Sequence, residues 1–353
     1  MLGLRDQLQS VSIDTLDAHP AAKPVTRIWV RPLLTIVAAA ALAVAAVGLL
    51  ARWVPLSNHV FMFAAALSPY LMSAAVLSVV LFVVGRRWVL AIAATVVLVV
   101  GVAIELPLFT SEHNDASTRT VPLRVMTANI YFGLADANTL AATANASADI
   151  LAVQELTPEA VRRLSAAGLD KSFPYHALDA RPGANGTGVW SRFPITASKR
   201  ITDYKLAMVS ARIKVEGVEV DPTVLIAHMS GPWPQPIDDW RADMKHMQAT
   251  MSELAESVGA GCAIVAGDFN STPDMREFRS LLRDGFQDAS EQAGAGFNRT
   301  YPANSRVIPP IIAIDHVLTF QCSATSAQTT ALPGSDHRGL MSSLEIPQSL
   351  TAS

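Results

Sequence analysis

The pattern of hydrophobic positions divides the chain into an apolar N-terminal part and a longer part in which short apolar runs alternate with polar segments. Three long apolar stretches come first, at residues 33–50, 60–84 and 88–109. Each is close to the roughly 20 residues that cross a bilayer as an α-helix. Short charged loops separate them, so we predict a bundle of three transmembrane helices over residues 33–109 rather than buried core helices. Because two more stretches follow the first, a retained membrane segment is favoured over a cleaved signal peptide.

The basic residues around these stretches predict how the protein is oriented. Five of them precede the first stretch or separate the second from the third: Lys23, Arg27, Arg31, Arg86 and Arg87. A single one, Arg52, lies between the first two stretches, and none follows the third before Arg119. Since cytoplasmic loops carry the excess of lysine and arginine, we predict a multi-pass protein of the cell membrane. Its residues 1–32 would be cytoplasmic, and the chain after residue 109 would be extracytoplasmic.

The part of the chain after the third stretch has the pattern of one α/β domain. Residues 110–121 are polar and aperiodic, which indicates a linker. Six apolar runs of strand length follow, at residues 122–130, 150–156, 188–193, 223–229, 263–269 and 311–320. Residues 238–257 have helical spacing with methionines on one side, and residues 273–285 begin with Pro and end with Gly, as a shorter helix does. We therefore predict a single domain over residues 122–347.

The charge of this outer part bears on its partners. Residues 112–353 contain 20 Lys+Arg and 26 Asp+Glu, a net charge of −6. Proteins that bind nucleic-acid backbones usually present a basic face, so this balance disfavours a nuclease without excluding a local basic patch.

The two cysteines, Cys262 and Cys322, both fall in the part of the chain that we predict to be extracytoplasmic. An oxidising compartment permits a disulfide between them. Each also lies beside an apolar run, where a buried free thiol is equally expected, so the sequence leaves both alternatives open.

Polar residues of chemically useful types lie at or near the ends of the apolar runs. They are Asn129, Glu155, His228, Asp268, Asn270, Asp315, Asp336 and His337. Singly, each has a structural explanation: Glu155 can be an acid at the start of a helix at Pro158, and His228 can be an ordinary core histidine. Together, acids and amides at strand ends collect at one sheet edge, where they repel one another unless a cation neutralises them. Their oxygen atoms suit a hard cation such as Mg²⁺, Mn²⁺ or Ca²⁺.

The order of short motifs along this part resembles a known superfamily. The motifs are "TANIYF", "VQE", "GVWSRFPI", "IAHM", "GDFNSTPD", "IDHV" and "GSDH", spread over residues 123–340. They resemble the endonuclease/exonuclease/phosphatase superfamily, with this chain as a membrane-anchored bacterial member. The resemblance implies the DNase I-like fold, an α/β (α+β) four-layer αββα sandwich of two packed mixed β-sheets flanked by helices. It also implies a divalent-metal-dependent hydrolase that acts on phosphoester bonds.

The resemblance assigns roles to the residues that surround the expected cation. Glu155 resembles the principal metal-binding carboxylate, with Asn129 beside it and Asp336 as a further ligand. Asp268 and Asn270 resemble the pair that positions the attacking water and holds the phosphoryl oxygens. The ion implied is Mg²⁺, or else Mn²⁺ or Ca²⁺.

The remaining three residues resemble the groups that act on the phosphate and the leaving oxygen. His337 resembles the histidine that contacts the scissile phosphate, as base or as electrostatic stabiliser, and Asp315 would orient it. His228 matches the position of a general acid for the leaving group. Phosphate-ester hydrolysis needs an in-line water, neutralised equatorial oxygens and a protonated leaving oxygen, so the sequence supplies one candidate for each task.

The predicted membrane segments bear on the substrate. A domain joined by a short linker to a bilayer has ready access to lipid headgroups. We therefore predict a phosphodiesterase or phosphatase acting on a lipid-headgroup or other cell-envelope phosphoester. A membrane-anchored extracellular nuclease is the first alternative, and a catalytically inactive metal- or phosphate-binding sensor is the second.

Overall fold

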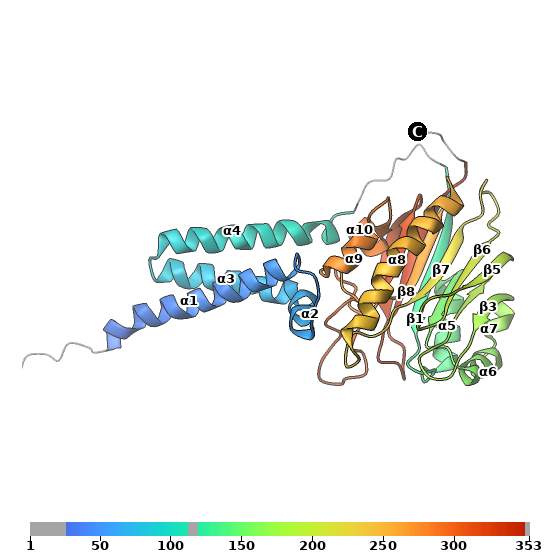
Figure 1. The fold of residues 1–353 in the computed structure, drawn as a ribbon, viewed down its shortest axis with the longest axis horizontal. Coiled ribbons are helices and arrows are strands. Elements are labelled where there is room, and N and C mark those ends of the chain that lie inside the picture. The colour runs from blue at the N-terminus through green and yellow to red at the C-terminus, as the bar shows by residue number, and fades with distance from the viewer. Residues whose placement is uncertain (1–25, 112–118, 350–353) are drawn as a thin grey trace, which may run out of the picture.

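The computed structural model describes residues 26–111 and 119–349, which form a bundle of helices followed by a β-sandwich domain (Figure 1). The predicted cytoplasmic segment 1–32 and linker 110–121 therefore lie largely outside the described residues. The first strand begins at Thr120, inside the predicted linker. We call residues 26–109 the helical bundle and residues 119–349 the sandwich domain.

The helical bundle contains two helices that are long and apolar enough to span a membrane, over Val30–Ala51 and Trp88–Phe109. They belong to α1 (Thr26–Ala51) and to α4 (Trp88–Glu105) with the short 3-10 helix η1 (Leu106–Phe109). The second predicted span is not one straight helix. It is divided into α2 (His59–Ala66) and α3 (Ser68–Val84), which meet at an angle of 66°, so the bundle has three spans only if this bent pair counts as one.

The bend in the second span has a local cause in the sequence. Pro69 lies in the first turn of α3, where its missing N–H is tolerated, and it cannot continue a helix from α2 through this point. At the other end of α3, the Arg86–Arg87 turn leads into α4, and this turn lies at the end of the bundle farthest from the sandwich domain (Figure 1).

The sandwich domain contains two sheets of six strands each. In spatial order the first sheet consists of β11 (Ser323–Thr330), β12 (Gly339–Pro347), β1 (Thr120–Asn129), β2 (Ile150–Gln154), β4 (Thr187–Ser191) and β3 (Tyr175–Asp179). The second consists of β5 (Ile195–Ile201), β6 (Met208–Ile213), β7 (Thr223–His228), β8 (Ala263–Asp268), β10 (Asp315–Phe320) and β9 (Gln287–Asp288). Each sheet is mixed, because β1 with β2 and β7 with β8 are parallel while the other pairs are antiparallel.

Three apolar layers hold the sandwich together. Branched side chains of both sheets, such as Val125, Ile226 and Ile264, fill the space between the sheets. Helices α5 (Ala137–Ser147), α6 (Pro158–Ala166) and α7 (Leu169–Ser172) cover the outer face of the first sheet. Helices α8 (Ile237–Val258) and α9 (Arg276–Leu281) cover the second, and the short α10 (Ala289–Gln292) lies beside β11. This arrangement confirms the predicted αββα sandwich.

The predicted elements are found with shifted ends. Strands β1, β2, β4, β7 and β8 occupy predicted runs, but the run at 311–320 forms a ladder only from Asp315 onward. The predicted helix at 273–285 is reduced to α9. The methionine face of α8 is buried against the second sheet, as its spacing predicts. Nine elements of the sandwich domain are not predicted: α5, α7, α10, β3, β5, β6, β9, β11 and β12.

The structure decides between the two alternatives for the cysteines. Cys262, just before β8, is joined by a disulfide to Cys322, just after β10. The bond links two neighbouring strands of the second sheet across a sequence separation of 60 residues.

Candidate active site

The core of the site is a row of three side chains across the second sheet. His228 is paired in register with Asp268 on the parallel strand β8, and Asp268 is paired with Asp315 on the antiparallel strand β10. All three side chains are buried. The row depends on Gly267, since a Cβ there would lie 1.9 Å from the carbonyl oxygen of Ala227 on β7. Glycine therefore allows β7 and β8 to approach where they carry the site.

Asn270 reaches Asp268 through a turn and not through strand alternation. Strand β8 ends at Asp268, and Asn270 has a positive φ of 48°. Asp268 Oδ1 accepts a hydrogen bond of 2.8 Å from the backbone N–H of Asn270. The Asn270 side chain donates from Nδ2 to the carbonyl oxygen of Met229 at 2.9 Å. Asp268 and Asn270 therefore lie together as the sequence predicts, but the turn after β8 brings them together and not the alternation of a strand.

The first sheet contributes an amide and an acid from two adjacent parallel strands. Asn129 is the last residue of β1, and its Nδ2 donates to Glu155 Oε1 at 3.2 Å and to Asp268 Oδ2 at 2.9 Å. Glu155 follows β2 with a positive φ of 57°, and its Oε2 accepts a hydrogen bond of 2.5 Å from the N–H of Phe132. Helix α6 begins only after Glu155, at Pro158 with Thr157 as its N-cap. Glu155 thus points into the site and does not cap the helix.

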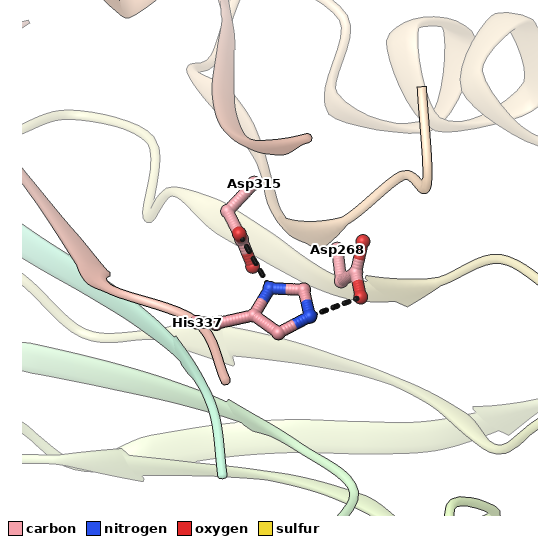
Figure 2. Close-up of side chains that lie close together, drawn as sticks. All are labelled: Asp268, Asp315 and His337. Atoms are coloured by element: carbon pink, nitrogen blue, oxygen red, sulfur yellow. Dashed lines mark hydrogen bonds and ion pairs between the residues drawn. The ribbon is translucent and has the colours of Figure 1, made fainter. Parts of the chain in front are cut away.

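The turn between β11 and β12 brings the remaining two residues to the same place. His337 Nδ1 is hydrogen-bonded to Asp315 Oδ2 at 2.8 Å, and its Nε2 lies 3.8 Å from Asp268 Oδ2. Figure 2 shows the imidazole ring between these two carboxylates. Asp336 Oδ1 lies 3.9 Å from the same Nε2. The turn is fixed by Ser335, whose Oγ donates to the carbonyl oxygen of Asn129 at 2.8 Å.

The carboxylates determine the charge of His337. Burial alone would lower the pKa of His337, but the carboxylates of Asp315 and Asp268 outweigh it and raise the pKa to about 10. The imidazole is therefore a cation at neutral pH. The cationic Nε2–H, 3.8 Å from Asp268 Oδ2 and 3.9 Å from Asp336 Oδ1, can donate to a phosphoryl oxygen, but a cationic imidazole cannot accept a proton. Of the two roles expected from the sequence, electrostatic stabiliser fits this environment and general base does not.

His228 has the opposite electrostatic environment. Burial, with a smaller effect of the neighbouring His337, lowers the pKa of His228 to about 3. Its Nε2 lies 4.0 Å from Asp268 Oδ2, and its Nδ1 is buried without a hydrogen-bond partner. A neutral imidazole in this position can donate one hydrogen bond, which is a weaker role than the proton transfer expected from the sequence.

The donor set fits a hard divalent cation. Asp268, Asp315 and His337 offer ligand atoms that lie within 4.8 Å of one another. Burial raises the pKa of both Glu155 and Asp336. The carboxylate of Asp336 adds to the rise in the pKa of Glu155, and that of Asp315 adds to the rise in the pKa of Asp336. Buried oxygens of Asp315 and Asp336 have no hydrogen-bond partner. Such carboxylates are stabilised by a positive ion with oxygen ligands. The hydrogen bond from His337 occupies one oxygen of Asp315, and both oxygens of Glu155 accept hydrogen bonds, from Asn129 Nδ2 and from the N–H of Phe132.

Two supporting residues were not expected from the sequence. The ring of Tyr301 packs on His337, with ring centroids 5.0 Å apart. His316 lies on the opposite side of β10 from Asp315, where its Nδ1 is 2.6 Å from Asp288 Oδ2 and its Nε2 is 3.0 Å from the carbonyl oxygen of Ser271. Strand alternation predicts that His316 faces away from the site, but nothing in the sequence identifies its partners.

All eight residues predicted for the site come together at one edge of the sandwich. Each is connected to another by a hydrogen bond or by a charged contact of 4.0 Å or less. A four-layer sandwich with acids, amides and histidines at this edge is the arrangement that the sequence resemblance implies for its class of protein, the hydrolases of phosphate esters.

Comparisons with known proteins agree with this class. The chain matches the model of the Endonuclease/Exonuclease/phosphatase family over residues 126–337, and it belongs to that family. Family members are phosphoester hydrolases, so the chain is an enzyme of this type. Among curated proteins, no sequence matches this chain.

Solved structures show the same fold at low sequence identity. Humanized TDP2 from D. rerio has a TM-score of 0.53 and 17% identity, over 63% of this chain and 98% of that one. D. rerio TDP2 complexed with a single-strand DNA product has a TM-score of 0.52 and 19% identity, over 63% and 98%. An endonuclease/exonuclease/phosphatase from Bacteroides vulgatus has a TM-score of 0.52 and 18% identity, over 64% and 99%.

Proposed function

We propose that this protein is a membrane-anchored, divalent-metal-dependent phosphoesterase whose site faces the extracytoplasmic side and acts on a phosphoester of a lipid headgroup or another envelope component. The observation that carries the proposal is the position of the site. Eight acid, amide and histidine residues gather in a domain that packs directly on the end of two membrane-length helices.

Two observations support the extracytoplasmic side. The Arg86–Arg87 turn lies at the far end of the bundle from the sandwich domain, as the positive-inside rule requires if that turn is cytoplasmic (Figure 1). The Cys262–Cys322 disulfide lies in the sandwich domain, and disulfides persist mainly in oxidising compartments.

Exposed apolar side chains near the site support a lipid substrate. Trp233 is 57% exposed, Val307 is 89% exposed and Ile308 is 51% exposed. Trp233 follows His228 by five residues and packs on the rings of His59 and Phe63 in α2. The loop with Val307 and Ile308 begins at Tyr301, which contacts His337. Tryptophan and aliphatic residues in such a position suit the boundary between water and lipid.

The proposed mechanism follows from the geometry of the side chains. Asp268 and Asn270 would orient the attacking water in line with the leaving oxygen. His337, held as a cation by Asp315, would stabilise the charge on the phosphoryl oxygens. His228 would donate a hydrogen bond to a substrate oxygen. Glu155, Asn129 and Asp336 would hold the divalent cation, Mg²⁺ in the first instance, which when bound supplies Lewis-acid stabilisation of the same charge.

A nuclease is the alternative that a specific observation favours. D. rerio TDP2, which shares the fold, is known in complex with a single-strand DNA product. Against it stands the acidic balance of the outer part, with 20 Lys+Arg and 26 Asp+Glu in residues 112–353. An inactive sensor is the second alternative, and it requires the site to bind a metal without turnover.

The full chain in nanodiscs, assayed with Mg²⁺ and with EDTA, separates these functions. The arms are phospholipid vesicles, a single-stranded DNA oligonucleotide and a soluble aryl phosphodiester. We expect Mg²⁺-dependent release of phosphate or headgroup from lipid and little cutting of DNA. Rapid DNA hydrolysis without lipid turnover would establish the nuclease, and metal binding without turnover in any arm would establish the sensor.

A further inference from the structure

The inner end of the helical bundle is part of the hydrophobic core of the sandwich domain. Leu56 and Met62 are buried in the same cluster as Trp240 of α8, Phe278 of α9 and Met275, the residue before α9. The backbone N–H of Leu56 also donates to Glu277 Oε1 at 2.9 Å. The bundle is therefore docked on the domain by packed apolar contacts and is not held by the linker alone.

A buried ionic cluster connects the bundle to the segment that follows the catalytic turn. Arg52, only 7% exposed, is ion-paired with Asp274, and its Nη1 lies 3.0 Å from Glu105 Oε1 at the end of α4. Arg279 donates to the carbonyl oxygen of Arg52 and, at 3.2 Å, to that of Pro273. Asp274 is four residues beyond Asn270 on the same short segment.

A second connection leads from the bundle to His337. Tyr70, in the first turn of α3, donates from its hydroxyl to the carbonyl oxygen of Ile311 at 2.6 Å. The N–H of Ile311 donates in turn to the carbonyl oxygen of Tyr301 at 2.9 Å. The ring of Tyr301 packs on His337. Two bonds and one ring contact thus separate the bundle from a residue of the site.

A third contact reaches the loop that follows His228. His59 Nε2, in the first turn of α2, lies 3.0 Å from the carbonyl oxygen of Pro232 and 3.3 Å from that of Gln235. This loop begins at Met229, whose carbonyl oxygen accepts the hydrogen bond from Asn270. Each of these three segments thus adjoins or contacts a residue predicted for the site.

We propose that Arg52 and Tyr70 of the helical bundle are positioning residues for the active site, acting through Asp274 and through Ile311 with Tyr301. The bundle then does more than attach the enzyme to a membrane, because it sets the geometry of the loops that carry Asn270 and support His337. A displacement of reacting groups by about 1 Å can cost about 10²-fold in rate, so loosening these loops has a measurable effect.

The test uses the full chain in nanodiscs and compares Arg52→Gln, Arg52→Lys and Tyr70→Phe with two matched controls. Arg86→Gln removes an arginine at the other end of the bundle, and Tyr175→Phe removes a hydroxyl from β3, which lies in the other sheet. Hydrogen–deuterium exchange is measured on peptides covering 271–279 and 300–312, with α5 as the reference. We expect faster exchange at 271–279 in Arg52→Gln and at 300–312 in Tyr70→Phe, with partial rescue by Arg52→Lys and no change in either control.

Kinetics give the second readout, which rests on the proposed function. With the soluble phosphodiester, Arg52→Gln and Tyr70→Phe should lower kcat by about tenfold to 10²-fold, with little change in KM. Faster hydrogen–deuterium exchange in the variants, confined to peptides 271–279 and 300–312, supports the inference even if the wild type shows no turnover. Absence of wild-type turnover would count against the proposed function alone. Wild-type exchange and wild-type kcat in both variants would overturn the inference. Tyr70→Phe removes a single oxygen atom, so it remains decisive if Arg52→Gln destabilises the whole protein.

Discussion

At the scale of single residues, the structure explains why one sheet edge can hold so many charges. His337 lies between Asp315 and Asp268, and Asn129 donates to both Glu155 and Asp268. These contacts leave one oxygen of Asp315 and one of Asp336 buried without a hydrogen-bond partner, and a hard cation would stabilise both. The sequence predicts the residue types and their convergence. It could not predict that Asn270 arrives through a positive-φ turn, or that Tyr301 packs on His337.

Glu155→Gln tests the metal side of the site. The amide keeps the shape of the side chain and removes its charge. Loss of a group that only hydrogen-bonds a metal ligand lowers metal affinity by about tenfold to 100-fold, so loss of a ligand charge should lower Mn²⁺ affinity by at least that much. Isothermal titration with Mn²⁺ measures it. Glu159→Gln is the matched control, since Glu159 is exposed on α6, where it pairs with Arg162. Equal Mn²⁺ affinity in Glu155→Gln and in the control would contradict the assignment.

The His316–Asp288 pair predicts a pH dependence of stability. Burial alone would lower the pKa of His316, but the carboxylate of Asp288 outweighs it and the pKa is raised. The proton on His316 therefore stabilises the fold fully below the unfolded pKa of about 6.5, and this contribution is lost as pH rises through the folded pKa.

Asp288→Asn should accordingly lower the melting temperature more at pH 6 than at alkaline pH. The asparagine can still accept the hydrogen bond from the N–H of Ser290, so the cap of α10 is retained. Asp238→Asn, at an exposed position on α8, serves as the control. A loss of melting temperature that is the same at every pH would show that the pair is not charged.

At the scale of elements, the strands that could be predicted are those buried on both faces. Strands β2, β4, β7 and β8 are buried along their whole length, and their sequences are short apolar runs. Edge strand β5 is mostly exposed and reads "ITASKRI", which has no alternating pattern to identify it. The run at 311–320 was predicted too long because Ile312 pairs with Tyr301 in an isolated bridge outside the sheet.

The disulfide that fixes β8 beside β10 and β11 should contribute strongly to stability. For a sequence separation of 60 residues, loop entropy predicts a loss of about 4 kcal/mol in the free energy of unfolding on its removal, within a usual range of about 2–5. Denaturant unfolding of Cys262→Ser/Cys322→Ser, compared with oxidised wild type, measures this loss, and reduced wild type should unfold like the double variant. A double variant as stable as the oxidised wild type would contradict the prediction.

At the scale of the whole molecule, the sequence predicts a membrane part and a catalytic part but not how they meet. The apolar stretches and the family motifs are local signals. The docking of Leu56 under α9, the pairing of Arg52 with Asp274 and the bond from Tyr70 to Ile311 join residues more than 200 positions apart. The bend between α2 and α3 is what brings α2 beside Trp233, and the sequence signal for it is Pro69 alone.

Val307 is exposed in the loop before β10, and its proposed partner is the bilayer on which the whole molecule would lie. Val307→Asp should lower turnover of lipid in vesicles by about tenfold, since burying an aliphatic side chain is worth about 1.5 kcal/mol or more. Turnover of the soluble phosphodiester should not change. Tyr175→Asp is the control, because Tyr175 is exposed on β3, an edge strand of the first sheet. An equal loss of turnover with both substrates, or no loss of turnover with vesicles, would show that Val307 does not bind the bilayer.

The most direct measurement of the central claim is Mg²⁺-dependent hydrolysis of phospholipid vesicles by the full chain and by Asp268→Asn. Asp268 contacts Asn129, Asn270 and His337, and Asp238→Asn is the control at an exposed acid. We predict that Asp268→Asn loses at least about 10²-fold in turnover, as expected for a residue that positions the attacking water, while the control keeps wild-type activity. Undiminished turnover in Asp268→Asn would contradict the account of this site.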